Sequence, residues 1–441
     1  MRRIVITVGE SSSDTDPEVV IETFLGSCVG LACYDATRRI GGLIHMLLPE
    51  GTQERELERP CAYVRSGIPY LLARLEELGA RRESLRAYLA GGARICSVQG
   101  DIDLHIGMRN ILAVKCLLQE LAIPLEIGDS GGHFGRTMRL FLADGRVEVC
   151  SFSAGVQRIS GVDGLAGPGE VELRQAIAEL KPASRIALDA LDAARDPAAS
   201  FHSIERLVLQ DQVLTASLFK LVNSSWYGLP RKLGRISESL AFLGLEGFRK
   251  LVLQSCLHTF YSRKLSGYAM EDGVLFEHAV GCARIAEMLA EKCGTVERED
   301  AYLAGLVHDI GKVVLERCCS ARIPALVDLM LTRNLFFYQA ERALLGLDHG
   351  QAGAMLAAEW RLAPSLAEAI RLHHDPTAAS SADMRLVAII HLADHICNTC
   401  GIGISLSTGS NPLNSAALAV LRLDTASIEE ILNAIPSRLA F

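Results

Sequence analysis

The hydrophobic periodicity of this chain of 441 residues changes near residue 160. Before that point, short apolar runs of β type, as at 29–35 and 41–48, alternate with stretches of helical spacing such as 70–78. After residue 170, helical spacing dominates and strand signals nearly vanish. The segment 158–170 between them is rich in glycine and small residues, which is typical of a flexible connection. The sequence therefore predicts a multidomain protein with an N-terminal α/β domain and a C-terminal all-α domain.

Length and composition narrow the class of protein. A chain this long exceeds what one hydrophobic core usually organises. The net charge of −8, without any local basic run, gives no electrostatic footprint for nucleic acid. No signal peptide is visible, no apolar run is long enough to span a membrane, and thirteen cysteines without framework spacing fit reduced thiols. We therefore expect a cytoplasmic protein with no nucleic-acid partner and no membrane insertion.

A thiol and an imidazole in the first domain form a candidate catalytic pair. Cys28 follows Gly26 and Ser27, where the backbone can turn and expose a side chain, and His45 lies on the next apolar segment. A cysteine at its free pKa of about 8.5 is weakly ionised near neutrality, and a neighbouring histidine can take its proton. Because a buried cysteine is more often structural, spacing alone leaves both interpretations open.

Several short motifs stand out in this region. The thiol lies in an LGSC motif and is followed by a GG-x-x-H segment that ends at His45. Further motifs are AGGA at 90–93, IGMRN at 106–110 and GGHFGR at 131–136. These motifs in this order resemble those of the CheD family, the bacterial chemoreceptor glutamine deamidases. The resemblance implies a CheD-like sandwich over residues 1–157.

The resemblance also implies a catalytic set and a reaction. Cys28 would be the nucleophile, His45 its base, and a threonine would complete the triad. Thr23 lies five positions before the cysteine and Glu22 six, so both are candidates for the residue that orients His45. The substrate would be a glutamine of a methyl-accepting chemoreceptor, which becomes glutamate with release of ammonia and without a cofactor. A CheC-like phosphatase is a further expected partner.

The second domain contains a set of histidines and aspartates on separate predicted helices. One of these helices is expected to run without a break over 298–318. Such side chains suit Mn²⁺, Fe²⁺ or Zn²⁺, and their spacing requires convergence across a helical bundle. The candidate metal ligands are His278, His308, Asp309, His349, His373, His374 and Asp394.

The string HDIGK at 308–312 is similar to the HD superfamily of metal-dependent phosphohydrolases, and the stretch 221–253 narrows the match to the HDOD subfamily. This resemblance implies an HDOD helical bundle over 171–400, with a front half at 171–265 and an HD-like core at 266–400. A C-terminal tail, 401–441, would follow, with a last short helix that starts at a capping box of Ser427 and Glu430.

Two interpretations of the histidine set stay open. Either the histidines hold one or two metal ions, or they are inherited residues that serve packing and hydrogen bonding. Against a full metal site stand Val274, where an acid would extend the cluster, and the missing GYP-like loop after His374.

The sequence as a whole favours a protein-glutamine deamidase with a cysteine nucleophile, coupled to an HDOD signalling domain in bacterial chemotaxis or related signal transduction. One alternative is a non-catalytic scaffold that binds chemoreceptors or a CheC-like partner. Another is a metal-dependent phosphohydrolase that acts on cyclic dinucleotides or nucleotides.

Overall fold

The computed structural model describes residues 2–93, 106–131, 135–151, 168–180, 198–223, 232–261, 272–323, 335–400 and 413–438, with a few residues in the gaps. These residues form two compact units. The first unit lies within 1–161, 327–337 and 394–438, and the second within 162–326 and 338–393. The predicted linker 158–170, and two stretches whose apolar spacing predicts helices, 184–194 and 324–332, lie mostly or partly outside the described residues.

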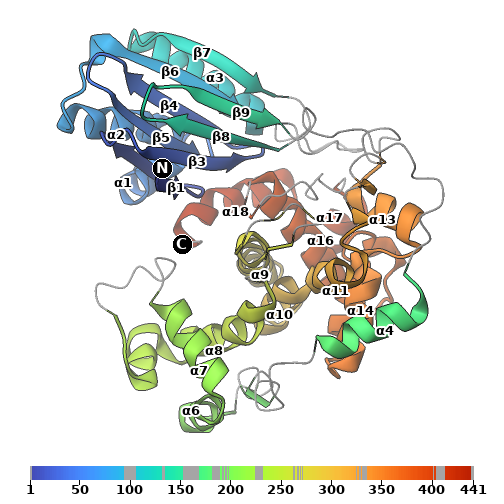
Figure 1. Cartoon of the computed structure of the whole chain (residues 1–441). Coiled ribbons are helices and arrows are strands. Elements are labelled where there is room, and N and C mark those ends of the chain that lie inside the picture. The colour runs from blue at the N-terminus through green and yellow to red at the C-terminus, as the bar shows by residue number, and fades with distance from the viewer. Residues whose placement is uncertain are drawn as a thin grey trace. The chain divides into compact units, whose positions relative to one another are not determined.

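The N-terminal part of the first unit contains two β-sheets (Figure 1). The four-stranded sheet has the order β1-β3-β8-β9 and the five-stranded sheet the order β2-β5-β4-β6-β7. Their strands are β1 (Arg2–Val5), β2 (Ser11–Asp14), β3 (Val19–Leu25), β4 (Val29–Asp35), β5 (Ile40–Met46), β6 (Leu85–Gly91), β7 (Leu125–Ser130), β8 (Arg136–Phe141) and β9 (Val147–Ser151).

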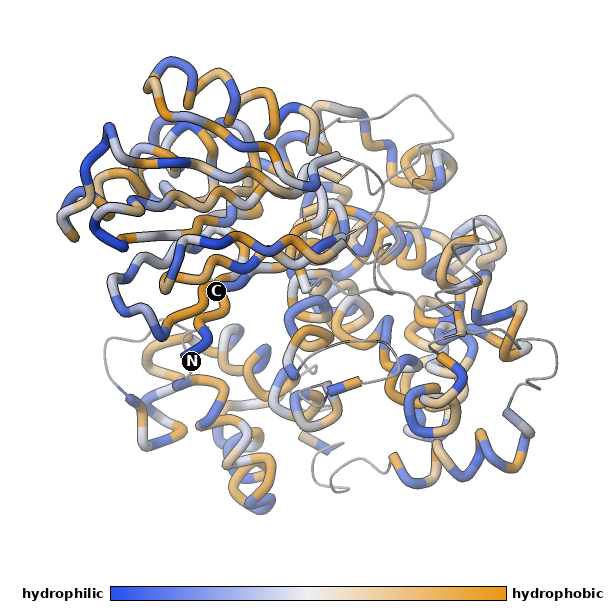
Figure 2. The backbone as a smooth tube through the Cα atoms, turned by 45° about the horizontal axis from the view of Figure 1, so that its top comes forward, coloured by the Kyte–Doolittle hydropathy of each residue, from blue (hydrophilic) through white to orange (hydrophobic). Residues whose placement is uncertain are grey.

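Alternating side chains on the central strands build two separate cores. On β4, Leu31 and Cys33 face helices α2 (Val64–Glu77) and α3 (Ile106–Glu120), which cover the outer face of the five-stranded sheet. Ala32 and Tyr34 face the other way, into the core shared with β3 and β8 of the four-stranded sheet. Figure 2 shows the hydrophobic colour along these central strands. The result is a helix layer on a two-sheet sandwich, which confirms the predicted α/β sandwich.

Individual elements show where the hydrophobic pattern was informative. The strand expected over 29–35 is β4 (Val29–Asp35). Asp144 and Gly145, a dipeptide typical of hairpin turns, lie between β8 and β9, which pair as an antiparallel hairpin. Strand β2 (Ser11–Asp14) escaped prediction because its sequence, SSSD, contains no apolar residue. It pairs with β5 at the edge of its sheet, so backbone hydrogen bonds, and not side-chain burial, hold it there.

The rest of the described chain is helical, which confirms the predicted all-α part. A short helix α1 (Gln53–Glu58) belongs to the N-terminal part. The later helices are α4 (Glu170–Glu179), α6 (Phe201–Gln210), α7 (Gln212–Val222), α8 (Ile236–Tyr261), α9 (Val274–Cys293), α10 (Arg298–Val307), α11 (Ile310–Cys319), α13 (Phe337–Leu345), α14 (His349–Glu359), α15 (Pro364–Leu372), α16 (Met384–Thr399), α17 (Ser415–Leu421) and α18 (Thr425–Arg438).

Two helix predictions were wrong. The expected continuous helix over 298–318 is broken into α10 and α11, because Asp309 leaves the helical conformation with φ −97° and ψ 8°. The capping box at Ser427 does not form, since α18 begins earlier, at Thr425, and the Ser427 amide donates to the Asp424 carboxylate. Within the residues that the structure describes, no helix is long and apolar enough to cross a membrane.

Candidate active site and histidine cluster

The LGSC turn is fixed by the AGGA segment, which begins within the end of β6. The Gly92 amide donates to the Cys28 carbonyl at 2.7 Å, and the Ala93 amide donates to the Gly26 carbonyl at 2.8 Å. Gly91 has φ +102°, and a Cβ there would lie 2.4 Å from the Cys28 carbonyl oxygen. The backbone of one motif therefore holds the backbone of the other, and only glycine fits at the contact.

His45 lies on β5 and is oriented by Thr23 of β3. The Thr23 hydroxyl donates its hydrogen to the Ile6 carbonyl at 2.9 Å, and its oxygen lies 2.8 Å from His45 Nδ1. Because the hydroxyl has only one hydrogen, its oxygen accepts from Nδ1. His45 is then the tautomer with its proton on Nδ1 and a lone pair on Nε2, which is the form that a general base requires.

Glu22, the other candidate for orienting His45, has different partners. Consecutive strand residues point to opposite faces, and the Glu22 carboxylate is held by Arg3 and by Arg139, whose Nε lies 2.6 Å away. Of the two candidates, the structure brings Thr23 together with His45.

Burial keeps both members of the pair neutral. It raises the pKa of the Cys28 thiol far above its usual range, against the smaller effect of a hydrogen bond from its own backbone. It lowers the pKa of His45 to about 3. His45 Nε2 has no hydrogen-bond partner among the described residues, whereas the Cys28 thiol donates to the carbonyl oxygen of Cys400 at 2.7 Å. The thiol hydrogen is therefore not shared with His45 in this conformation.

Two residues of the other motifs support this region. Asn110 is fully buried, and its side chain donates to the Leu47 carbonyl at 2.9 Å and to the Ser27 carbonyl at 3.4 Å, so it ties the end of β5 to the LGSC turn. Arg136, also buried, contacts the Asp129 carboxylate at 3.0 Å. The sequence contained both within recognised motifs but assigned neither a role.

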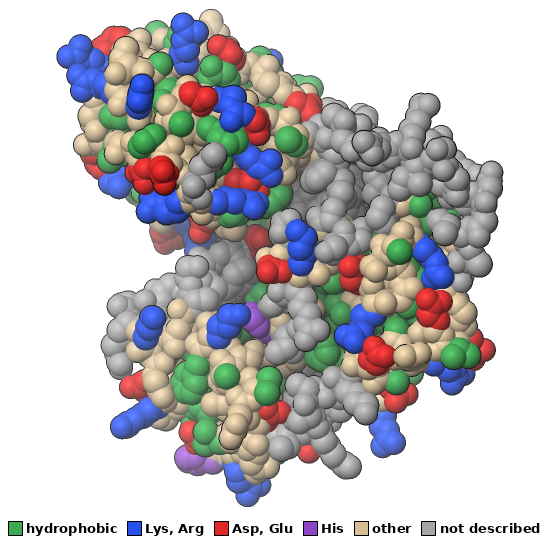
Figure 3. Space-filling model, in the orientation of Figure 1, with side chains coloured by type: hydrophobic (Ala, Val, Ile, Leu, Met, Phe, Trp, Pro, Cys, Tyr) green, Lys and Arg blue, Asp and Glu red, His purple; other side chains and the backbone are tan. Residues whose placement is uncertain are grey.

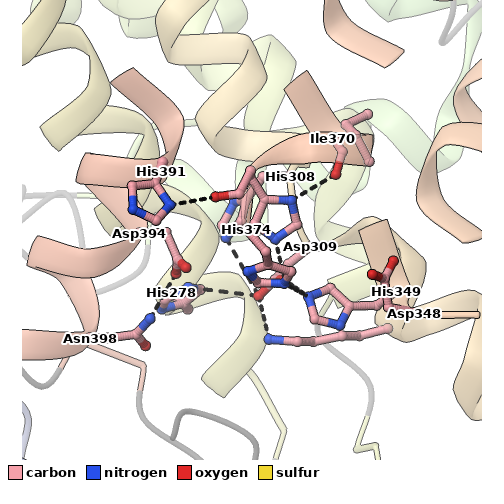
Figure 4. Close-up of polar contacts among 12 residues, drawn as sticks. His278, His308, Asp309, Asp348, His349, Ile370, His374, His391, Asp394 and Asn398 are labelled. Atoms are coloured by element: carbon pink, nitrogen blue, oxygen red, sulfur yellow. Dashed lines mark hydrogen bonds and ion pairs between the residues drawn. The ribbon is translucent and has the colours of Figure 1, made fainter. Parts of the chain in front are cut away.

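The histidine set of the second unit lies at helix ends (Figure 4). His278 is on α9, and His349 is the first residue of α14. His308 and Asp309 occupy the break between α10 and α11, where a continuous helix had been predicted. A Cβ on the next glycine, Gly311, would lie only 1.7 Å from the His349 carbonyl oxygen, so α11 and α14 are in backbone contact at this point.

Four imidazole nitrogens surround the Asp309 carboxylate. The Nε2 atoms of His349 and His373 lie 3.2 and 3.9 Å from Oδ1. The corresponding atoms of His308 and His278 lie 3.5 and 3.7 Å from Oδ2. His374 joins the cluster through its Nε2, 2.7 Å from the Nε2 of His349. The structure thus brings together six of the seven predicted ligands.

The inner nitrogens of these histidines are held by backbone and carboxylate oxygens. Nδ1 of His308 contacts the Gly305 carbonyl at 2.7 Å, and Nδ1 of His373 contacts the Ile370 carbonyl at 2.7 Å. These contacts fix the rings so that Nε2 points at the centre of the cluster, as metal-binding histidines are fixed in other proteins.

Charge in the cluster is set by Lys312 and Glu341, which had not been assigned as site residues. Burial alone would raise the pKa of Asp309, but the Lys312 ammonium, 2.6 Å away, and the imidazoles outweigh it and hold that pKa well below its usual range. Burial would likewise lower the pKa of His349, but Glu341, 2.6 Å from its Nδ1, and Asp309 outweigh it and raise that pKa to about 9.

One feature of the sequence could have identified Glu341 as a site residue. It lies on α13 four residues after Phe337 and three before Leu344, which places a carboxylate on the apolar face of an amphipathic helix. The seventh predicted ligand, Asp394, belongs to the first unit, where its carboxylate accepts a hydrogen bond from Asn398 at 2.8 Å. Its place among the ligands stays a prediction.

Comparison with known proteins identifies the N-terminal part. A family model described as CheD chemotactic sensory transduction matches residues 47–151. Over 160 residues the chain is 34% identical to a protein of Clostridium acetobutylicum named "Probable chemoreceptor glutamine deamidase CheD". The aligned residues make up 36% of this chain and 96% of that protein. The chain belongs to the CheD family. A CheD protein of the same name from Clostridium botulinum strain Hall is 36% identical over 160 residues, 99% of its length.

The CheD relationship covers about a third of the chain, and the helical part has its own relatives. A model described as HDOD domain matches residues 180–376. The solved structure of an HDOD domain protein with unknown function from Geobacter sulfurreducens is 26% identical, with a TM-score of 0.47 over 61% of this chain and 97% of that one. Residues 180–376 are therefore similar to HDOD domains by the family model, and the chain joins this helical part to a CheD domain.

Proposed function

We propose that the CheD domain deamidates glutamine side chains of chemoreceptors, with Cys28 as nucleophile, His45 as general base and Thr23 as the positioning residue. The observation that carries this proposal is the hydrogen bond between Thr23 and His45 Nδ1, which leaves the Nε2 lone pair available as a proton acceptor. The names of the relatives supply the substrate class, a chemoreceptor glutamine.

The reaction follows from the properties of these groups. His45 Nε2 takes the Cys28 proton, and the thiolate attacks the carboxamide carbon of the substrate glutamine. In this proposal, backbone amides of the LGSC turn stabilise the oxyanion, and the His45 imidazolium gives its proton to the departing ammonia. Water, activated by the neutral His45, then hydrolyses the thioester. The products are glutamate, ammonia and the free enzyme, and the reaction needs no cofactor.

Mass mapping of a purified chemoreceptor tests the proposal directly. Incubation with the full chain should convert specific glutamines to glutamates, and Cys28→Ala should abolish the conversion. Cys33→Ala is the matched control, because Cys33 is equally buried on the adjacent strand but belongs to the apolar core. Conversion that persists in Cys28→Ala, or that is lost equally in both variants, would contradict the assignment.

We also propose that the HDOD domain binds a divalent Mn, Fe or Zn ion at the cluster around Asp309. The donor set fits such an ion: in each of two groups, His349 with His373 and His374, and His278 with His308 and Asp309, the ligand atoms all lie within 4.8 Å of one another. An ion held there would supply Lewis acidity, as in the phosphohydrolases of the HD superfamily.

Elemental analysis of the purified chain tests this second proposal. Stoichiometric metal that is lost in His308→Ala and in Asp309→Ala supports it. His258→Gln, a change at a histidine of the same unit outside the cluster, is the control and should leave the metal content unchanged. Absent metal, or metal unaffected by all three changes, would show that the histidines serve packing and hydrogen bonding.

For the whole chain we propose a cytoplasmic signalling protein whose domains are 1–157 (CheD) and 171–400 (HDOD), with methyl-accepting chemoreceptors as substrates and a CheC-like phosphatase as a further partner. On the face shown in Figure 3, basic and acidic side chains are interspersed over the CheD domain. Such a mixed surface does not concentrate charge of one sign, so we expect contacts with a receptor to depend on specific pairs.

A further inference from the structure

The partner of the Cys28 thiol comes from the far end of the chain. The Sγ atom donates to the backbone carbonyl of Cys400 at 2.7 Å, across 372 positions of sequence, and both residues belong to the first unit. Cys28 and Cys400 are fully buried. In a working cysteine–histidine pair the thiol would share its hydrogen with the imidazole. Here that hydrogen is directed to a carbonyl that cannot act as a base.

The position of Cys400 explains why its carbonyl suits this contact. Its amide donates to the Ile396 carbonyl at 2.8 Å, so Cys400 continues the last turn of α16. The final carbonyls of a helix have no partner within the helix and carry the negative end of its dipole. A thiol can satisfy such a carbonyl, but a thiolate would be repelled by it. This helix end therefore has the opposite effect to the helix N-termini that activate catalytic cysteines.

The segment that carries Cys400 has further contacts with the CheD domain. Helix α18 contacts α1, and Glu429 on α18 lies 3.7 Å from Arg109 on α3. These contacts are separate from the thiol. The segment thus meets the CheD domain both at its nucleophile and on its helices.

We propose that the described C-terminal residues 394–400 and 413–438 form an intramolecular inhibitor of the deamidase, which covers Cys28 and diverts its thiol from His45. The proposal rests on the proposed role of Cys28 as nucleophile. A substrate carboxamide has to approach Sγ to about 3–3.5 Å before attack. The Cys400 carbonyl already occupies that position, so the segment and the receptor glutamine bind in turn. The segment must leave Cys28 before catalysis. A receptor or a partner protein that replaces α18 on the CheD domain would therefore activate the enzyme.

The alkylation rate of Cys28 in the full chain, measured by peptide mass mapping with iodoacetamide, tests the proposal without a substrate. Cys116 and Cys150 are exposed reference thiols, and Cys33 is a buried one whose labelling would report unfolding. In the wild type, Cys28 should react far more slowly than Cys116. Glu429→Arg replaces attraction to Arg109 by repulsion, and from the usual strength of a surface pair we expect an increase of about three- to tenfold in the Cys28 rate.

Two further variants complete the experiment. Arg109→Glu combined with Glu429→Arg should restore the slow rate, and Glu359→Arg, a change of the same charge at an exposed position of α14, should not alter it. A Cys28 rate equal to that of Cys116 in the wild type, or one unaffected by Glu429→Arg, would overturn the proposal. An increase that Cys33 shares would also overturn it, because the segment would then support folding instead of covering the site.

Receptor deamidation by the same samples separates the two proposals. A faster Cys28 without any glutamate formed would refute the deamidase and leave the covering segment in place. Glutamate formed at one rate by the wild type and by Glu429→Arg, with equal Cys28 reactivity, would refute the inhibitor and leave the deamidase. The inhibitor proposal expects both rates to rise together in Glu429→Arg.

Discussion

Replacement of Thr23 by valine removes one hydroxyl and keeps the shape of the side chain. In the structure that hydroxyl makes two buried hydrogen bonds, to the Ile6 carbonyl at 2.9 Å and with His45 Nδ1 at 2.8 Å. An unsatisfied buried polar group costs about 1–3 kcal/mol, and two such groups are left, so the free energy of unfolding should fall by about 2–6 kcal/mol. His45 would also lose the acceptor that fixes its tautomer and ring orientation.

The catalytic effect should exceed what the loss of stability explains. General-base catalysis contributes about 10²- to 10⁴-fold, and a base that is present but poorly oriented loses part of this, so we expect kcat to fall about 10- to 100-fold in Thr23→Val. The acid limb of the pH–rate profile should move to lower pH, because the imidazolium has lost a hydrogen-bond acceptor. Initial rates of glutamate formation over a pH series, together with urea denaturation, measure both effects.

Thr23→Ser is the matched control, since it keeps the hydroxyl and removes a methyl group. It should retain the wild-type pH profile and most of the rate. A Thr23→Val enzyme with kcat within about twofold of the wild type would refute the positioning role. So would an equal loss in the serine and valine variants, because the hydroxyl would then not be the group that matters.

Three more changes test other parts of the structure. Gly91→Ala places a Cβ 2.4 Å from the Cys28 carbonyl at φ +102°, so we expect more than tenfold loss of deamidation and a lower urea midpoint, whereas unchanged activity would show that the LGSC turn does not depend on this contact. Gly311→Ala would bring a Cβ 1.7 Å from the His349 carbonyl and should separate α11 from α14, lowering the melting temperature and any metal content. For His45, the pKa falls from an ordinary 6.5 to about 3 in the folded chain, so the unfolded state binds more protons between these values. The stability that the buried neutral imidazole contributes is therefore lost as pH falls, by up to about 1.4 kcal/mol per pH unit. Between about pH 6.5 and 4.5, the free energy of unfolding should decline less steeply in His45→Gln than in the wild type. Equal slopes would contradict a buried neutral imidazole.

Local pattern predicted much of the fold, because alternation and helical spacing reflect which face of an element is buried. The strand at 29–35 and the helices around His278 follow from such patterns. The SSSD strand and the break at Asp309 do not: backbone pairing with β5 holds the strand, and α11 and α14 are in backbone contact at Gly311, two residues after the break. Periodicity carries no information about contacts that are made by the backbone.

Some residues of the candidate sites could be predicted from the sequence, and others required the tertiary structure. Motif resemblance singled out Cys28 and His45, but it left Thr23 and Glu22 open, because their order in the chain does not say which one faces the imidazole. Strand register decides that question by pointing successive side chains to opposite faces. Glu341 became visible as the partner of His349 only once α13 and α14 were placed side by side.

By itself, the sequence determined the two-domain character, the thiol and the imidazole of the first domain, and the histidine set of the second. Only the tertiary structure decided which atoms meet: the Thr23 hydroxyl with His45, the imidazoles with Asp309, and the Cys28 thiol with the carbonyl of Cys400. The physical reason is that hydrogen bonds depend on distance and direction over a few ångströms. Residues 372 positions apart reach that range only through the packing of the elements between them.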